Sequence, residues 1–263
     1  MQNPYWIAYR NLRTNDKKRY MLSASLSYDI TDWLNISGRV RVDNSSTKYE
    51  QKLYASSNTT LTEGSAQGFY AISKPDETQV YADALANINK RLGDYSIVVN
   101  IGASIIDNKY DELSYRGPIR ANGIPNVFNV FDLDNTQKKA RQDEWEEQTQ
   151  SIFASAEVGW KSMLYLTLTG RSDWASQLAN SSSTCFFYPS IGLSAVVSEM
   201  VKLPSFVDYL KVRSSFSSVG MPYPRNLTSP TFEYDETTQT WKPKTHYPIG
   251  DLKPERTDSW ELG

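Results

Sequence analysis

Two polar stretches of this sequence carry clustered acidic residues, whose carboxylates could bind a metal ion. Asp132 and Asp134 alternate in an extended segment, and calcium takes carboxylate oxygens of this kind as ligands. The rest of a calcium-binding loop is missing around them, so we expect solvated loop acids. Glu144, Glu146 and Glu147 form a second acidic cluster, which we interpret as a solvated face. Neither stretch predicts a metal site.

The sequence contains a single cysteine and a single histidine, which excludes several kinds of site. Cys185 alone cannot form an intramolecular disulfide or a cysteine-rich metal site, and we expect an inert loop or interface thiol. His246 alone makes a histidine-based zinc site or a histidine triad improbable, and its Pro-rich surroundings favour a solvated loop position. Glu157 and Asp173 lie on polar faces, but no spacing pairs them as the two carboxylates of a glycosidase. We therefore predict no catalytic residue, no metal and no cofactor, and a protein that is not an enzyme.

Aromatic residues in the long polar segments are the best candidates for binding a ligand. Phe128 and Phe131 lie in one such segment, and Trp241 and Tyr247 lie in a Pro-rich one nearer the C-terminus. Exposed aromatic faces can stack on sugar rings, and functional residues are frequent in loops. The alternative is that these side chains anchor the loops to one another or to a partner protein.

The composition excludes further classes of protein. The chain has 263 residues with a net charge of −2, so it lacks the basic surface of a nucleic-acid-binding protein. We find no polybasic run for an anionic membrane surface, no charged and apolar leader at the N-terminus, and no apolar stretch long enough for a transmembrane helix. The length fits one large all-β domain or two ordinary domains.

The elements that position these residues are predicted to be β-strands, because apolar and polar residues alternate with a period of two. No window shows a helical period over more than a few residues; 136–149 is the nearest, and it fits a short loop helix or a polar extension of a strand. The alternating segments are 20–30, 34–42, 82–88, 97–105, 152–160, 164–170, 191–197 and 210–212.

The connections between these strands alternate in length. Tight turns are expected at 31–32, 91–94 and 161–162, and long connections at 55–67, 115–144, 175–186 and 220–255, with an intermediate one at 199–208. Short turns therefore gather at one end of the sheet and long loops at the other. Outer-membrane barrels have this asymmetry.

The apolar stripes lie next to the tight turns, whereas the same strands become polar on both faces towards the long loops. This pattern predicts a lower part of the sheet in lipid and an upper part in water. Tyr28 and Trp160 lie near tight turns, and Tyr20 and Trp174 lie further up their strands on the same face. Two aromatic girdles have this spacing. Ordinary sheet aromatics remain the alternative.

Several segments, in order along nearly the whole chain, match one protein family. They are Asn3-Pro4-Tyr5-Trp6, YDITDWLNISGR at 28–39, YEQKLY at 49–54, LYLTLTGRSDW at 164–174, FYPSIGLSA at 187–195, LKVR at 210–213 and LKPERTDSWELG at 252–263. With these segments the chain resembles the barrel of SusC/RagA-type TonB-dependent outer-membrane transporters.

The resemblance implies an all-β fold, an antiparallel meander that forms part of a transmembrane barrel. The family barrel has about 22 strands around a plug, and we expect 8–9 of them here, with residues 1–263 as an internal part of one barrel domain that lacks the signal peptide, the plug and the closing strands. For the intact protein it implies uptake of oligosaccharides, or sometimes peptides, across the outer membrane of a Gram-negative bacterium. TonB would supply the energy, and a SusD-like surface lipoprotein would form the lid.

Two other classes of function remain open on the sequence. A soluble, secreted all-β module that binds glycans would also carry aromatic loops, and it predicts solubility without detergent. A β-rich carbohydrase would need a carboxylate pair whose alanine variants lose hydrolysis, and the sequence offers no good pair.

Overall fold

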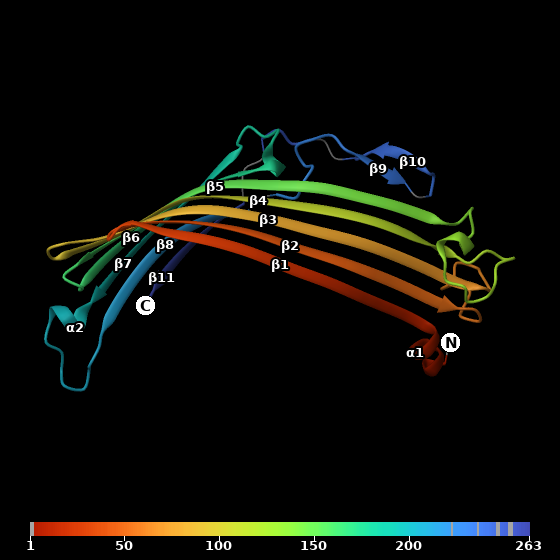
Figure 1. The fold of residues 1–263 in the computed structure, drawn as a ribbon, viewed down its shortest axis with the longest axis horizontal. Coiled ribbons are helices and arrows are strands. Elements are labelled where there is room, and N and C mark those ends of the chain that lie inside the picture. The colour runs from red at the N-terminus through yellow and green to blue at the C-terminus, as the bar shows by residue number, and fades with distance from the viewer. Residues whose placement is uncertain (1–2, 222, 236, 246–247, 252–254) are drawn as a thin grey trace. The chain divides into compact units, whose positions relative to one another are not determined.

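In the computed structural model, the regular structure is dominated by β-strands (Figure 1). The structure describes residues 3–221, 223–235, 237–245, 248–251 and 255–263. Its main sheet has nine strands in the order β1-β2-β3-β4-β5-β6-β7-β8-β11, an antiparallel meander, and β9 and β10 form a separate two-stranded sheet. The predicted all-β fold class and the number of strands are confirmed.

The first five strands of the sheet are long. They are β1 (Asn11–Thr31), β2 (Leu34–Tyr54), β3 (Gly68–Leu92), β4 (Tyr95–Pro118) and β5 (Lys139–Trp160). Their lengths match the expectation that each strand has an apolar part beside a tight turn and a polar extension beyond it.

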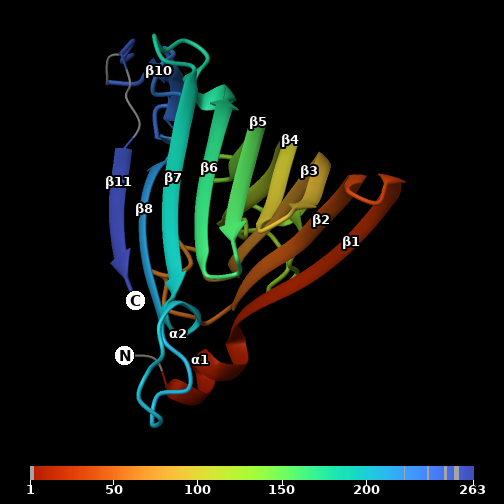
Figure 2. The same ribbon diagram turned by 90° about the vertical axis from the view of Figure 1, so that its left-hand side faces the viewer.

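The later strands are shorter, and Figure 2 shows β11 beside β8. They are β6 (Leu164–Ala175), β7 (Cys185–Val196), β8 (Lys211–Met221), β9 (Phe232–Asp235), β10 (Thr240–Pro243) and β11 (Glu255–Leu262). The helices are α1 (Pro4–Arg10) and α2 (Val197–Met200), and η1 (Val130–Asp132) and η2 (Ser176–Leu178) are single turns of 3₁₀ helix.

The chain divides into two compact units. Unit 1 comprises Met1–Leu22, Val42–Gln79 and Asn108–Glu146, and unit 2 comprises Ser23–Arg41, Val80–Asp107 and Glu147–Gly263. Unit 1 thus contains the polar ends of β1 to β5 with the connections 55–67 and 119–138, and unit 2 contains their apolar ends, the later strands and the remaining connections.

Within unit 2, the strands carry their apolar side chains on one face, and many of them are exposed. Alternate positions carry no charged residue over 24–30 of β1, 34–40 of β2, 80–88 of β3, 97–105 of β4, 152–160 of β5 and 164–174 of β6. We call this surface the uncharged band. Because a sheet in water must bury its apolar face against another layer, exposed leucines and isoleucines across several strands require a cover other than water.

A compact apolar core in unit 1 lies where two long connections meet. Leu53, Phe69, Ile119 and Leu133 are buried there, and an isolated bridge joins Ile119 to Leu133. The Ser65 hydroxyl donates to the Ile119 carbonyl oxygen at 2.6 Å, which ties residues 55–67 to residues 119–138. These connections are therefore packed loops with their own core.

The connection between β4 and β5 is shorter than the sequence predicted. β4 continues to Pro118 and β5 begins at Lys139, so 119–138 replaces the expected 115–144. The segment 136–149, which fitted either a helix or a strand extension, is mostly strand. Contacts between the polar extensions explain the difference: the rings of Tyr110 and Trp145 stack with their centroids 5.4 Å apart.

Helix α1 and the β9–β10 hairpin were absent from the prediction. In α1 the Asn3 side chain accepts from the Tyr5 amide at 2.9 Å, and a proline stands in the first turn. Both features favour a helix start, but seven residues are too few to show a helical period. The hairpin strands have four residues each, which is too short for alternation to stand out.

Candidate functional site

The face of the sheet opposite the uncharged band carries a ladder of amide and hydroxyl groups in unit 2. Asn87 donates to Asn100 at 2.5 Å, and Asn100 donates to Ser155 at 3.1 Å, which joins β3, β4 and β5. Thr167 on β6 donates to Glu157 on β5 at 3.2 Å. The neighbouring strands thus share a hydrogen-bonding surface that suits water or polar ligands.

Ion pairs lie on the same polar face. Arg39 on β2 donates to Asp83 on β3 at 2.7 and 2.9 Å, and its guanidinium lies 5.4 Å from the ring centre of Tyr81. Arg171 on β6 donates to Asp173 at 2.6 Å and to Ser151 on β5 at 2.9 Å. These ion pairs orient the arginines along the sheet.

The polar face of unit 1 contains a stacked aromatic pair beside a held carboxylate. The rings of Tyr110 and Trp145 stack at an interplanar angle of 14°. The Ser73 and Tyr110 hydroxyls donate to the two oxygens of Glu112 at 2.6 and 2.5 Å. These hydrogen bonds lower the pKa of Glu112, and the bond from Ser73 has the largest effect. Partial burial, followed by the interaction with the Glu112 carboxylate, raises the pKa of Tyr110. Glu112 is therefore an anion and Tyr110 a neutral donor near pH 7.

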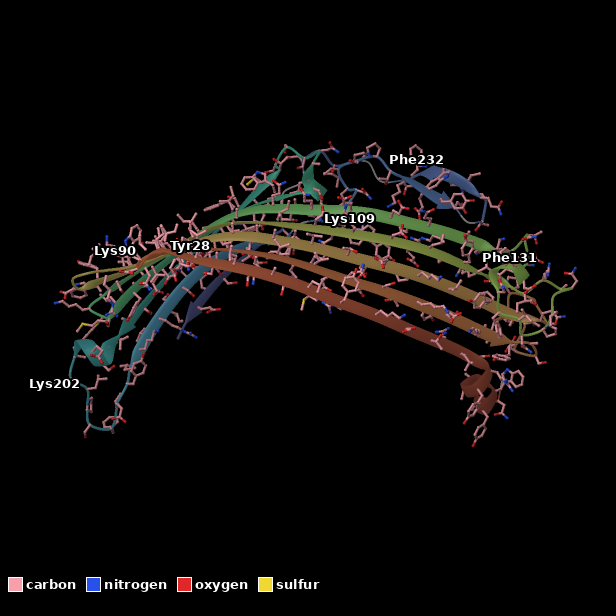
Figure 3. The ribbon with its side chains drawn as sticks, in the orientation of Figure 1. Tyr28, Lys90, Lys109, Phe131, Lys202 and Phe232 are labelled. Carbon is pink, nitrogen blue, oxygen red and sulfur yellow. The ribbon has the colours of Figure 1, made fainter. Side chains whose placement is uncertain are left out.

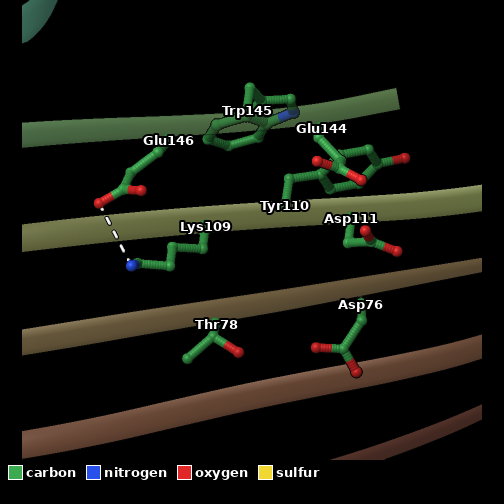
Figure 4. A pocket seen from close by; sticks show the side chains of 8 residues that line it. All are labelled: Asp76, Thr78, Lys109, Tyr110, Asp111, Glu144, Trp145 and Glu146. Atoms are coloured by element: carbon green, nitrogen blue, oxygen red, sulfur yellow. Dashed lines mark ion pairs between the residues drawn. The ribbon is translucent and has the colours of Figure 1, made fainter. Parts of the chain in front are cut away.

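A shallow acidic pocket of about 410 Å³ lies on β3, β4 and β5 of unit 1 (Figure 4). Lys109 and Glu146 form an ion pair across it at 3.3 Å. Asn44 donates to Asp76 and Thr78 at 2.8 Å, so these side chains share one face. Asp111 and Glu144 also line it. The four carboxylates exceed the single ammonium group, so the pocket attracts cations.

The acidic pocket does not have the geometry of a metal centre. Over the described ranges, no group of three or more histidine, cysteine or acidic side chains is placed to hold a metal ion. Tyr110 and Trp145 also line this pocket (Figure 4). The pocket therefore combines an excess of acidic groups with two aromatic residues.

The β9–β10 hairpin presents an aromatic surface in unit 2. Phe232 pairs with Pro243 and Tyr234 with Trp241, so these four residues share one face, which we call the hairpin face. The Tyr234 and Trp241 rings meet edge to face with centroids 5.3 Å apart. Phe232 is 65% exposed and Trp241 68%. The hairpin face thus combines large apolar area with a fixed backbone.

The turn of this hairpin is held by an aspartate. Asp235 accepts from the amides of Thr237 and Thr238 at 2.8 and 3.2 Å, and its other oxygen accepts from the Lys242 ammonium at 2.5 Å. These hydrogen bonds lower the pKa of Asp235, and the bond from Lys242 has the largest effect. Because the anion binds both the turn and the second strand, it sets the register that places Trp241 opposite Tyr234.

Three of the four loop aromatics that the sequence singled out lie within the described residues. Phe128 is half-buried, with its ring 5.0 Å from that of Tyr54 and 6.1 Å from that of Tyr70. Phe131 is 86% exposed on η1 (Figure 3), and Trp241 belongs to the hairpin face. Tyr247 lies outside the described residues, as does His246. Phe128 thus has the contacts of a loop anchor, and Phe131 and Trp241 are accessible to a ligand.

The four expected girdle aromatics lie on strands and keep accessible rings. Tyr28, which Figure 3 labels on β1, and Trp160 at the end of β5 belong to unit 2, as does Trp174 near the end of β6. Trp160 is 38% exposed and Trp174 39%. Tyr20 on β1 belongs to unit 1 and is exposed. A lipid-contacting role for these residues stays a prediction.

Acids from both of the acidic stretches singled out in the sequence have protein partners. Asp132 accepts from Arg120 at 2.9 Å, and Asp134 accepts from the Thr136 amide and hydroxyl. The Thr136 bonds lower the pKa of Asp134. Glu147 pairs with Arg225 at 3.3 Å. Their oxygens thus serve loop turns and ion pairs.

The remaining candidate groups also lack a catalytic arrangement. Glu157 lies opposite Thr167, whereas Asp173 lies further along β6 and is held by Arg171. Cys185 begins β7 opposite Trp174 and is half-buried. The two carboxylates are therefore not brought together across a cleft.

Sequence reasoning missed the Tyr110–Trp145 stack and the hairpin face. Each depends on strand register, which brings together residues from different strands. A local signal existed for the hairpin alone: Asp235 precedes a run of threonines, and aspartate side chains commonly accept from backbone amides two residues on.

The sequence and the fold of this chain are similar to those of known proteins. The family model for the β-barrel of TonB-dependent receptor-like proteins matches residues 2–263. A structure of the RagAB peptide importer in its open-open state aligns with a TM-score of 0.81 at 14% identity, covering 100% of this chain and 29% of that chain. The siderophore receptor PiuA from Acinetobacter baumannii aligns with a TM-score of 0.55 at 14% identity, covering 95% of this chain and 37% of that chain.

At such low identity the solved structures show the fold alone, and the chain spans less than a third of the RagAB chain's length. Among curated proteins, none matches the sequence. Within the described residues, no helix is long and apolar enough to cross a membrane. The family model covers nearly the whole chain, and its members are barrels of Gram-negative outer membranes. The chain belongs to the TonB-dependent receptor-like β-barrel family.

Proposed function

We propose that this chain forms part of the barrel of an importer in the outer membrane of a Gram-negative bacterium. The observation that carries the proposal is the uncharged band, which lies back to back with a hydrogen-bonded polar face on the same strands. Its uncharged stretches run for about nine residues on β3, β4 and β5, close to the 9–11 tilted residues that cross a bilayer. The band would contact lipid and the polar face would border the plug or water.

The imported substrate that the accessible aromatics fit is an oligosaccharide. Trp241 and Phe232 expose flat apolar faces on a hairpin with fixed register, and such faces can pack against sugar rings. Peptides are the second candidate, because the related structures are named as the RagAB peptide importer. We propose that TonB supplies the energy through regions of the whole protein beyond this barrel part.

A SusD-like surface lipoprotein is the proposed partner. The hairpin face and Phe131 are the accessible aromatic surfaces for a lid or a ligand, and exposed aromatic area is enriched at protein interfaces. Cell fractionation tests the location: we expect the full-length protein with the outer membrane, solubilised only by detergent. Recovery in the soluble fraction would favour the secreted glycan-binding module instead.

Substitution of Trp241 tests the ligand site. In the full-length protein we expect Trp241→Ala to weaken oligosaccharide binding roughly tenfold or more, because a stacked aromatic contact contributes about 1 kcal/mol beyond the area it buries. Isothermal titration with a panel of oligosaccharides and peptides gives the affinity. Phe206→Ala, which removes an exposed aromatic between α2 and β8, is the matched control and should bind normally. Equal affinity of wild type and Trp241→Ala would contradict the assignment.

A further inference from the structure

A groove of about 600 Å³ crosses the uncharged band of unit 2. We call it the alanine groove, after Ala82 and Ala84 on β3 and Ala103 on β4, which line it. Ile105, Ile152 and Trp174, from β4, β5 and β6, line it as well. The alanine side chains are short and their neighbours are long, so the surface is hollowed where the three alanines meet.

Asp83 and Ser151, two polar residues beside the groove, have their side chains engaged on the polar face. Asp83 is held there by Arg39 at 2.7 and 2.9 Å. Ser151 accepts from Arg171 on that same face at 2.9 Å. Gln150 also lines the groove, on the uncharged-band side of β5, and donates to Gln148 at 2.9 Å. The groove thus carries this amide at its border beside a mostly apolar lining.

The mostly apolar lining of the groove determines which class of ligand could bind there. A sugar or a peptide in the groove would find the Gln150 amide but would leave most of its hydroxyls or amides without partners, and each unpaired buried polar group costs free energy. An unbranched hydrocarbon chain loses nothing in the same position and covers the exposed isoleucines. The groove is continuous with the uncharged band, whose stretches match the thickness of a bilayer. The membrane is therefore the source of hydrocarbon that this face meets.

We propose that the alanine groove holds the acyl chain of a lipid from the surrounding membrane, as a retained lipid rather than a freely exchanging one. The inference rests on the membrane location proposed above and adds a defined site to it. Trp174 at the border of the groove would pack its ring against the chain.

Filling the groove tests whether a lipid is retained. Ala84→Leu and Ala103→Leu each extend a side chain into the space, and Ala156→Leu makes the same change on the uncharged band outside the groove lining. The full-length protein is released from phosphatidylcholine bilayers into detergent, and bound lipids are counted by native mass spectrometry. Each displaced methylene contact costs roughly a factor of four in affinity, so we expect occupancy in the two groove variants to fall roughly tenfold and Ala156→Leu to match wild type.

Tryptophan quenching separates failure of this inference from failure of the proposed function. In bilayers of phosphatidylcholine brominated along its acyl chains, the emission lost in Trp174→Phe relative to wild type reports on Trp174 alone. We expect strong quenching of that component. Quenching together with equal lipid retention in all variants would overturn the groove site and leave the membrane location standing.

Two other outcomes also overturn the proposal. A Trp174 component that iodide in the buffer quenches and brominated lipid does not would place this face in water, against both the groove site and the membrane location. A retained species with the mass of a lipoprotein's acyl anchor would make the occupant a partner. If one groove variant fails to fold, the other carries the comparison with Ala156→Leu.

Discussion

At the scale of single residues, the polar groups of this chain are held by partners in neighbouring strands. Arg39 with Asp83 and Ser73 with Glu112 are examples, and each joins positions more than thirty residues apart. Such pairs hold the polar face of the sheet in one arrangement. The residues that face away from these pairs supply the apolar surface.

Gly68 shows how a backbone position limits side-chain choice. Its φ is +118°, and an added Cβ would lie 2.6 Å from the Leu53 carbonyl oxygen. We expect Gly68→Ala to lower the free energy of unfolding by at least about 2 kcal/mol, from backbone strain and the clash together. Gly64 also has positive φ, +92°, with open space around it, so Gly64→Ala should cost less. Denaturant unfolding of the full-length protein compares the two, and equal losses would contradict the clash.

The Glu112 cluster predicts a pH dependence. Because hydrogen bonds from Ser73 and Tyr110 lower the folded pKa of Glu112, its contribution to stability is complete above the ordinary glutamate pKa and is lost as the pH falls through the lowered value. We expect Tyr110→Phe to remove about 1 kcal/mol near pH 7 and to move the acid unfolding midpoint to higher pH. Tyr115→Phe on the same strand is the control. An unchanged acid unfolding midpoint in Tyr110→Phe would contradict this prediction.

At the scale of elements, the two faces of each strand have opposite chemistry. On β6, Leu166 belongs to the uncharged band, whereas Thr167 donates to Glu157 on the polar face. The same backbone therefore presents adjacent positions to different surroundings. A substitution at either position reports on its own face.

Charge placed on β6 tests this contrast. If Leu166 faces hydrocarbon at the midplane, Leu166→Lys should lower the free energy of unfolding in lipid vesicles by about 2–4 kcal/mol. Thr167→Lys puts the same charge beside Glu157 and should cost about 1 kcal/mol or less. Ile36→Lys on β2 should behave like Leu166→Lys. Tolerance of lysine at both uncharged-band positions would move that face away from lipid.

At the scale of the whole molecule, the described sheet ends in two strands with one neighbour each. β1 pairs with β2, and β11 pairs with β8 through Glu255–Leu262. A strand edge without a neighbour presents free backbone donors and acceptors. Both edges are thus open to pairing with further strands.

The open edges predict the behaviour of this chain alone. Residues 1–263, refolded without lipid or detergent, should associate at micromolar concentration, because the free edges and the exposed uncharged band both favour contacts between copies. Sedimentation velocity measures the assembly state. The full-length protein in detergent should sediment as one defined species. A monodisperse monomer of 1–263 in plain buffer would contradict this expectation and favour the soluble module.

The sequence by itself determined the all-β class, the strand-rich meander, the tight turns near 31–32, 91–94 and 161–162, and the family. These follow from local features, because a period of two and short turn motifs are visible along the chain without knowing which strands meet. The predicted face of each strand follows from the same alternation.

Tertiary structure decided which residues meet. The stacking of Tyr110 on Trp145, the burial of Phe128 against Tyr54 and Tyr70, the hairpin face and the alanine groove all depend on register between strands or on loop packing. Register is a cooperative property of the assembled sheet, in which a shift of one residue moves every side chain to the other face. Alternation along one strand does not say which residue of the next strand lies opposite, so these contacts became visible only when the strands were placed side by side.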